Sequence, residues 1–181
     1  ERNYSYLPSR NSNTLSDFAA KYVLKRKVKK FKTYTWLDRG SDERQYCAPG
    51  IDLPIASVMR TKYLDYPEYH TSLDNLKKVV TPKGLNGGFN ILKEMLIVLE
   101  QNIIPRYTIL CEPQLSKRNL YSKISKKNLK NKNSYMILHL LSLSDGKTSL
   151  IEIAEKCSMP IWKINNIITK LLKHKLIEIK Y

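Results

Sequence analysis

A basic segment without any acidic residue divides this chain into two parts with different hydrophobic patterns. Residues 114–133 (QLSKRNLYSKISKKNLKNKN) hold seven Lys and Arg residues and no Asp or Glu. Before this segment, β-branched and aromatic runs alternate with helical patterns, and after it three helical patterns follow one another. Because a linker of this composition buries little apolar surface, we expect two domains, over 1–113 and 134–181, joined by a basic linker over 114–133.

The first part has the element order of an α/β domain. Asn13 or Thr14 is suited to cap its first helix and Ser72 its second, and the stretch TPKGLNGG (81–88) is expected to break the chain. A hundred residues of this kind form only part of a typical α/β sheet, so we expect the rest of the sheet to lie outside this chain. We expect strands at 4–8, 31–36 and 54–60, and helices at 15–26, 73–80 and 89–102.

The last part has the pattern of a winged-helix or helix-turn-helix domain, with three helices and an apolar strand-like tail. Ser149 and Glu152 form a capping box at the second helix, and Pro160 lies in the first turn of the third. The third helix offers Lys163, Asn166 and Lys170 to a nucleic acid, but it has no arginine to read guanine edges. The pattern therefore favours packing or oligomer contact over sequence-specific DNA binding. His139 and His174 are assigned to solvent or helix packing.

Charge and cysteine content bear on three classes of protein: nucleic-acid-binding proteins, disulfide-stabilised proteins and proteins with a cysteine-built zinc site. The net charge of +16 resembles that of a nucleic-acid-binding protein, but nearly half of the excess lies in the basic linker and Lys-rich character runs along the whole chain. Three widely spaced cysteines (Cys47, Cys111 and Cys157) argue against a disulfide framework or a cysteine-built zinc site and favour a reducing cytoplasm. No apolar run reaches the roughly 18–20 residues needed to span a bilayer. The chain begins at Glu1 without a methionine, which suggests a partial chain.

Two polar loops at strand ends hold the residues that are able to bind a metal or take part in catalysis. Asp42 and Glu43 belong to the loop SDERQYC, and His70 follows the last expected strand between Glu68 and Asp74. Imidazole and carboxylate groups are zinc ligands, and ligands bind outside the carboxyl ends of strands in open α/β sheets. His70 with Asp42 or Glu43 is therefore a candidate metal or catalytic group. The alternative, which spacing alone leaves open, is that His70 is a hydrogen-bonded surface residue.

Three segments of the chain are distinctive: GSDERQYCAPGIDLPIASVMRTKYLDYPEYHTSLDNL (Gly40–Leu76), YSYLPSRNSNTLSDFAAKYVL and CEPQLSKRNLY (Cys111–Tyr121). Together they resemble a bacterial family of polysaccharide-biosynthesis proteins with an aminopeptidase-like domain and a C-terminal winged helix. That family is similar to zinc aminopeptidases of the bacterial leucyl type, whose two-metal site consists of His, a bridging Asp, Glu, Asp and a final His. The resemblance implies the C-terminal part of such an α/β domain, with sheet partly outside the chain, followed by the winged helix.

Carried over by position, the resemblance assigns roles to individual residues. His70 would be the final metal ligand, and Asp42 a ligand or a neighbour of the metal, although Glu43 stands where the related motif has a histidine. Asp74 and Glu68 would orient the ligand loop. The substrate pocket would include Glu43, Arg44, which is suited to clamp a carboxylate, and Tyr46, which is suited to donate to an oxyanion.

The resemblance implies a zinc-dependent, aminopeptidase-like amide hydrolase linked to surface-polysaccharide biosynthesis, acting on a peptide or an amidated sugar. One or two zinc ions would be completed by ligands in an N-terminal remainder of the same protein, so this chain alone is expected to be inactive. A homo-oligomer is compatible with this prediction, and no membrane or DNA partner is expected. The alternative is a nucleic-acid- or protein-binding winged-helix module on a non-catalytic scaffold.

Overall fold

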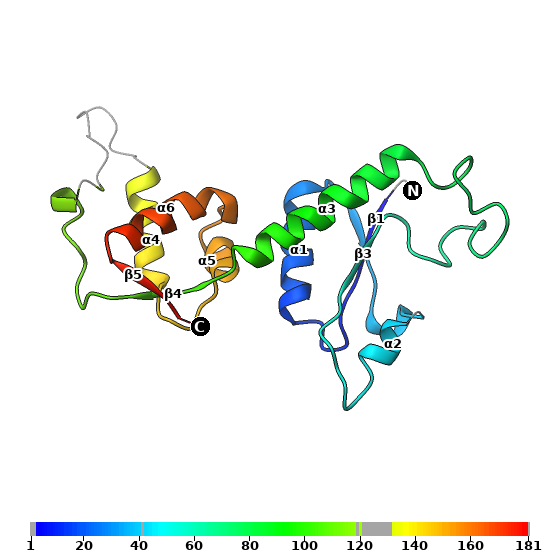
Figure 1. Ribbon diagram of the computed structural model, residues 1–181, viewed down its shortest axis with the longest axis horizontal. Helices are drawn as coiled ribbons and strands as arrows, with labels where there is room; N and C mark the ends of the chain where they lie inside the picture. Colours follow the sequence, from blue (N-terminus) through cyan, green and yellow to red (C-terminus); the bar gives the residue numbers. More distant parts are fainter. Residues whose placement is uncertain (1–2, 41, 119, 121–131, 181) are drawn as a thin grey trace. The chain divides into compact units, whose positions relative to one another are not determined.

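The computed structural model describes residues 3–40, 42–118, 120 and 132–180, and it divides into two compact units, Glu1–Leu99 and Glu100–Tyr181. The first unit is built on a three-stranded sheet with the strand order β2-β1-β3 (Figure 1). β1 (Tyr4–Leu7) pairs in parallel with β2 (Phe31–Thr33) and antiparallel with β3 (Ser57–Met59). The expected strands are thus present but shorter than predicted, and α1 (Leu15–Lys27) is the crossover between the two parallel strands.

A buried carboxylate fixes the turn between β1 and α1. Asp17 is fully buried, and its two oxygens accept hydrogen bonds from Tyr6 Oη at 2.6 Å, from the backbone and hydroxyl of Ser9, and from the backbone and hydroxyl of Thr14. Thr14 is the cap of α1, which decides between the two residues, Asn13 and Thr14, that the sequence left open. Burial by itself would raise the pKa of Asp17, but the hydrogen bonds from Ser9, Tyr6 and Thr14 outweigh it and lower the pKa.

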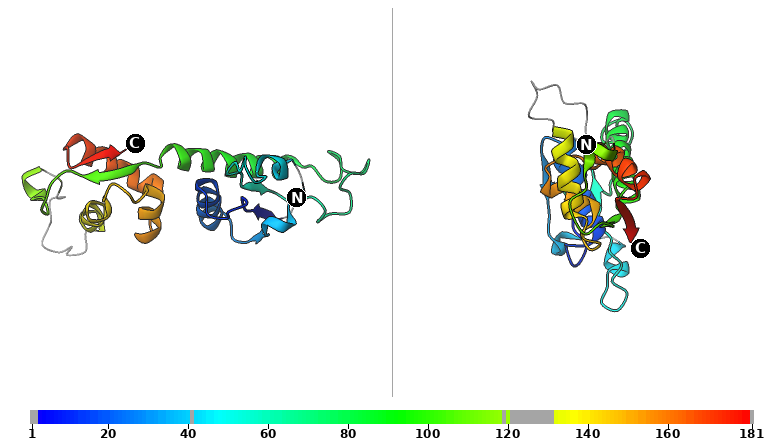
Figure 2. Two further views of the ribbon diagram at one scale, coloured as in Figure 1. Left: turned by 90° about the horizontal axis from the view of Figure 1, so that it is seen from below. Right: turned by 90° about the vertical axis from the view of Figure 1, so that its left-hand side faces the viewer.

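The long helix α3 (Pro82–Glu100) begins seven residues earlier than the sequence predicted, so the expected chain break at 81–88 is wrong. Thr81 Oγ1 accepts a hydrogen bond from the Gly84 amide at 3.1 Å, and Pro82 occupies the first helical position, where its missing N–H costs nothing. A Cβ at Gly87 would lie 2.6 Å from Arg60 Nη1 and 2.8 Å from Tyr4 Oη, so a larger residue there requires the ends of these two side chains to move. The helix also runs past the end of α1, where Lys27 pairs with Glu94 (Figure 2).

The helix expected after Ser72 is also absent, and residues 71–79 form consecutive turns instead. The Asn75 side chain accepts hydrogen bonds from the amides of Lys77 and Lys78 at 3.0 and 3.2 Å, and its amide group donates to the Ser72 carbonyl. Such side-chain bonds to the local backbone compete with the helical pattern. A short helix, α2 (Glu43–Tyr46), and a 3-10 turn, η1 (Trp36–Asp38), lie between β2 and β3.

The second unit is a three-helix domain closed by a two-stranded sheet. Its helices are α4 (Lys132–Leu143), α5 (Leu150–Lys156) and α6 (Ile161–Lys173). The Ser149–Glu152 capping box of α5 is formed as predicted, whereas Pro160 is the cap of α6 rather than a residue of its first turn. The helices enclose a core of fully buried side chains: Leu140, Leu150, Ile153, Ile161, Ile164 and Leu171.

The structure places the division between the units earlier in the chain than the sequence suggested. β4 (Ile104–Tyr107) pairs antiparallel with β5 (Ile177–Lys180), and Arg106 forms a further bridge to Asp145. Residues 104–107, expected in the first domain of 1–113, thus belong to the winged-helix unit. The predicted linker of 114–133 includes the 3-10 turn η2 (Leu115–Arg118), but its residues 119 and 121–131 lie outside the described part of the chain.

None of the helices in the described ranges combines the length and the apolar character needed to cross a membrane.

The two adjacent glycines of α3 provide a test of this packing. Replacing Gly88 with Ala should stabilise the protein by about 0.5–1 kcal/mol, because helix propensity improves and the nearest atom to the new Cβ is 3.9 Å away. Gly87→Ala should gain less or lose stability, because Arg60 and Tyr4 must move. Urea unfolding of the two variants decides this, and a larger gain at position 87 would contradict the described contact.

Candidate functional site

Helix α2 (Glu43–Tyr46) begins beside a buried guanidinium, that of Arg39. Arg39 is 2% exposed, and its Nη2 atom donates to the carbonyl oxygens of Leu7, Pro8 and Ile55 at 3.2, 2.8 and 3.4 Å. Its Nη1 atom lies 2.9 Å from Ser57 Oγ and 3.1 Å from Glu43 Oε1. Arg39 thereby connects the end of β1, the segment entering β3 and the start of α2.

Glu43 is turned toward this internal group. Its Oε1 atom also accepts a hydrogen bond from Ser57 Oγ at 2.9 Å, and its Oε2 atom is buried without a partner in the described residues. Burial by itself would raise the pKa of Glu43, but the Ser57 hydrogen bond and the Arg39 charge outweigh it and lower the pKa. Glu43 therefore remains a carboxylate with a structural partner, and this geometry does not favour a proton-transfer role for it.

The other residues of the SDER loop are more accessible. Asp42 and Arg44 are exposed, Tyr46 is 53% exposed, and Arg44 Nη1 donates to the Arg39 carbonyl at 3.1 Å. Cys47 is fully buried, and its thiol donates to the Leu53 carbonyl, which fits the expected small core residue. Arg44 and Tyr46 thus retain side chains that can reach a ligand, while Cys47 fixes the end of α2.

The His70 loop is organised by stacked rings. The His70 imidazole is exposed and stacks on the Tyr69 ring with centroids 4.0 Å apart, while Tyr66 and Tyr63 contact Tyr69 at 5.7 and 6.0 Å. His70 has a φ of 59°, a left-handed conformation that is uncommon outside glycine. The Gly40 amide donates to Tyr63 Oη at 2.8 Å, which ties this cluster to the segment that enters the SDER loop.

The two acidic neighbours of His70 have different roles. The Asp74 carboxylate accepts a hydrogen bond from Tyr66 Oη at 2.9 Å, and burial together with this bond raises the pKa of Tyr66 to about 12. Glu68 contributes its backbone carbonyl, which accepts from the Thr71 amide and hydroxyl. Asp74 therefore braces the loop through Tyr66 rather than through the imidazole.

The described residues do not by themselves assemble a metal site. Within them, no group of three or more His, Cys, Asp or Glu side chains is placed to hold a metal ion, and no hydrogen bond or ion pair joins His70 to Asp42 or Glu43. A zinc site needs at least three protein ligands. The described residues thus offer an accessible imidazole at His70, but they do not by themselves complete such a site.

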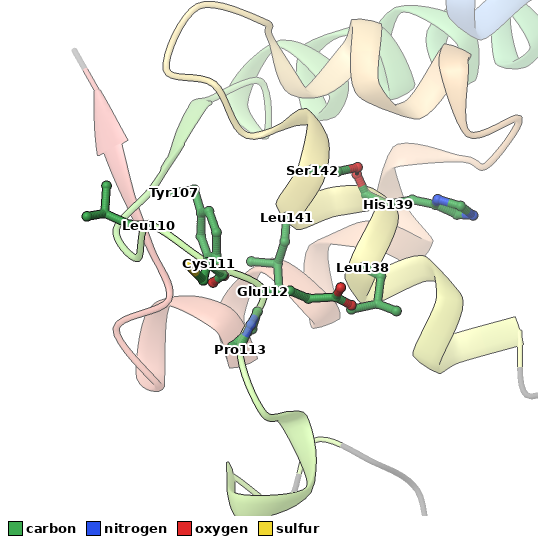
Figure 3. A pocket seen from close by; sticks show the side chains of 9 residues that line it. All are labelled: Tyr107, Leu110, Cys111, Glu112, Pro113, Leu138, His139, Leu141 and Ser142. Atoms are coloured by element: carbon green, nitrogen blue, oxygen red, sulfur yellow. Dashed lines mark hydrogen bonds between the residues drawn. The ribbon is translucent and has the colours of Figure 1, made fainter.

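A hollow that the sequence did not indicate lies in the winged-helix unit (Figure 3). It has a volume of about 340 Å³ and is bounded by the segment after β4 and by one face of α4. Glu112 lies beside Leu138 at this hollow, whereas the side chains of Leu110 and His139 point outward. Sequence analysis missed it because residues 108–113 were assigned to the other domain. Tyr107 Oη donates to the Cys111 carbonyl, so much of the polar lining is already paired.

Arg39 was also missed from the sequence, and its role is testable against a neighbouring arginine. Arg39→Met should cost about 3–5 kcal/mol of unfolding free energy, because it leaves the Glu43 carboxylate and the carbonyl groups without their partner. Arg44→Met, at an exposed position with one hydrogen bond, should cost less than about 1 kcal/mol. Urea unfolding followed by tyrosine fluorescence measures both, and equal losses would refute the central position of Arg39.

Comparison with known proteins supports the resemblance seen in the sequence. Over 145 residues the chain is 35% identical to a Clostridium acetobutylicum protein named "Putative polysaccharide biosynthesis protein with aminopeptidase-like domain", covering 77% of this chain and 32% of that protein. A crystal structure of a "putative peptidase" from the same organism matches 99% of this chain and 39% of its own chain, with a TM-score of 0.83 and 28% identity. The chain thus spans about a third of the length of these relatives.

Two family models divide the chain at nearly the same point as the two compact units. Residues 103–179 match the model described as winged helix-turn-helix, which includes β4 and so agrees with the observed pairing of β4 and β5. Residues 1–102 match the model described as "Domain of unknown function (DUF4910)", which covers more than half of the 181 residues. The chain therefore belongs to the DUF4910 family and continues into a winged helix-turn-helix domain.

Proposed function

We propose that the α/β unit is part of a zinc-dependent, aminopeptidase-like amide hydrolase associated with polysaccharide biosynthesis, and that the remaining metal ligands come from a longer polypeptide. The names of the Clostridium acetobutylicum relative and of the solved structure support the class, and their greater length supports ligands outside the matched region. The observation that carries the proposal is the His70 loop, where an exposed imidazole in a left-handed conformation is held by the Tyr69 ring. Unusual backbone conformations of this kind concentrate at functional sites.

In this proposal each loop has a separate task. His70 would be one zinc ligand, and zinc, when bound, would supply a polarised water for attack on an amide carbonyl. Stacking on Tyr69 limits the rotation of the imidazole, and Asp74 braces Tyr66 behind it. Arg44 and Tyr46 are exposed on α2 and are suited to hold a carboxylate and a carbonyl oxygen of a peptide or an amidated sugar.

The general base is then expected outside the described residues. Glu43 already pairs with Arg39 and Ser57, and the pKa of its carboxyl group is lowered by that environment. A carboxylate with this pairing is a poor proton acceptor because protonation would break the ion pair. The proposal therefore assigns Glu43 to positioning α2, and it predicts that this chain alone has no hydrolytic activity.

The metal assignment is tested in the full-length protein with two histidine variants. His70→Ala should lower zinc affinity and hydrolytic activity together, each by at least about 100-fold, because removing a ligand costs more than disturbing its surroundings. His174→Ala is the matched control, since His174 is an exposed residue at the end of α6. The zinc content is measured by elemental analysis, beside activity on aminoacyl anilides and N-acylated sugars. Retention of zinc and activity in His70→Ala would refute the ligand assignment, and a zinc-free wild-type protein would refute the metal.

A second candidate function rests on the outer face of α6. Lys163, Asn166 and Lys170 are all exposed there, on the side opposite the buried Ile164, Ile168 and Leu171. This face is polar and basic, as nucleic-acid-binding helices are, but it carries no arginine for reading bases. Nucleic-acid binding through this face would depend mainly on phosphate contacts of the two lysines.

Salt dependence separates this candidate from a protein-contact role. If Lys163 and Lys170 contact phosphates, the affinity for a labelled DNA duplex should fall with salt with a log–log slope of about −0.9 per lysine contact, and Lys170→Gln should reduce that slope by about 1. Lys156→Gln, at the end of α5, is the control. Fluorescence anisotropy measures both. Binding that is weak and insensitive to salt would exclude the nucleic-acid function and leave packing against a protein.

A further inference from the structure

Helix α3 carries large apolar side chains on two different faces. One face is buried within the first unit through Ile91, Met95 and Val98. A second set is exposed, and we refer to it as the α3 stripe: Leu85, Phe89, Leu92 and Leu96, which are 58, 63, 48 and 63% exposed. At about 100° per residue these four positions fall on one line along the helix, roughly a third of a turn from the buried face.

A helix at the surface of a globular protein normally has one apolar stripe and a polar remainder. The polar residues of α3 occupy only the remaining sector, through Lys83, Asn86, Asn90 and Lys93, all of which are exposed. In α6 of the same protein, by contrast, the exposed face is polar. Apolar side chains around most of a helix are typical of a helix buried between two elements. The α3 stripe is therefore a face that packs against a further element.

The small sheet of the same unit also has surface that no described element covers. Its central strand β1 is buried at Ser5, Tyr6 and Leu7, as in the interior of a larger sheet. Its outer strands have three residues each, and among the described residues each one pairs with β1 only. Each outer strand has one edge whose backbone groups pair with no further strand among the described residues, and proteins often cover such edges with a helix or loop. The unit thus has an uncovered helix face and two open sheet edges.

The size of the stripe argues against a second copy of this chain as its cover. Four side chains exposed to this extent present on the order of 400 Å², about half of what each partner buries in a stable interface. A segment of the same polypeptide needs less area, because association within one chain does not lose translational freedom. The Clostridium acetobutylicum relatives have the required length, since this chain spans only 32% and 39% of them.

We propose that the α3 stripe is the docking face for an apolar helix or strand of the longer aminopeptidase-like polypeptide. This inference rests on the proposed longer polypeptide, and it adds the surface by which its two parts are held together. Docking there would fix α3 and, through the contact of Gly87 with Tyr4 and Arg60, the start of β1. The metal ligands of the two parts would then be held in one domain.

The test compares charge substitutions in the full-length protein and in the 181-residue chain. Phe89→Glu should lower the melting temperature of the full-length protein by about 5 °C or more, because it buries an unpaired charge at the docked face. The same substitution should change the melting temperature of the 181-residue chain by less than about 2 °C, because the position is exposed there. Asn90→Glu is the control, with the same charge on the polar face of the same helix, and should be neutral in both.

Several outcomes overturn the inference. A neutral Phe89→Glu in the full-length protein would do so, as would a dimer of the 181-residue chain that Phe89→Glu dissociates, since that result assigns the stripe to a second copy. If Phe89→Glu prevents folding of the full-length protein, Phe89→Ser should give a smaller but measurable loss, and a neutral result there also overturns it. The metal proposal is judged separately. If the full-length protein contains no zinc but Phe89→Glu destabilises it, the metal proposal is refuted and the docking proposal stands. If the protein contains zinc but Phe89→Glu leaves its melting temperature unchanged, the docking proposal is refuted and the metal proposal stands.

Discussion

The arrangement of the first unit depends on the buried guanidinium of Arg39. A charge of this kind is costly to remove from water unless a counter-charge and several hydrogen bonds replace the solvent. Glu43, Ser57 and the carbonyl groups of Leu7, Pro8 and Ile55 supply them. Because these groups come from the end of β1, the segment before β3 and the start of α2, one side chain fixes the loop that carries Asp42, Arg44 and Tyr46.

This constraint separates the polar residues of the candidate site into two groups. Glu43 and Asp74 are engaged with Arg39 and Tyr66, and they hold the two loops in place. His70, Arg44 and Tyr46 remain accessible, and they are the residues through which a metal or a substrate would be bound in the proposed hydrolase. A paired carboxylate and an accessible imidazole have different chemistry although the sequence presents them in similar polar loops.

The two units differ in how completely they bury their apolar surface. In the winged-helix unit, β4 returns to pair with β5, and three helices enclose a common core. In the α/β unit, the α3 stripe and the outer strands β2 and β3 remain uncovered among the described residues. This difference agrees with the relatives, of which the chain spans about a third. The uncovered surface of the α/β unit is the observation on which the proposed docking of further polypeptide rests.

The sequence by itself determined the features that depend on local interactions. The caps at Thr14 and Ser149, the apolar periodicity of α1 and α6, and the positions of the three short strands follow from neighbouring residues, and the motif around His70 was sufficient to identify the relatives. Tertiary structure decided the rest. Hydrogen bonds of the Asn75 side chain hold turns where a helix was expected. Gly87 lies within α3 at a place where the Tyr4 and Arg60 side chains approach the helix closely. Strand β4 pairs with β5, which lies about seventy residues further along the chain. Arg39 found its partners among carbonyl groups more than thirty residues away as well as in Glu43, one turn ahead. Such contacts have no local signal, because they form only when distant segments are brought together by the burial of a shared core.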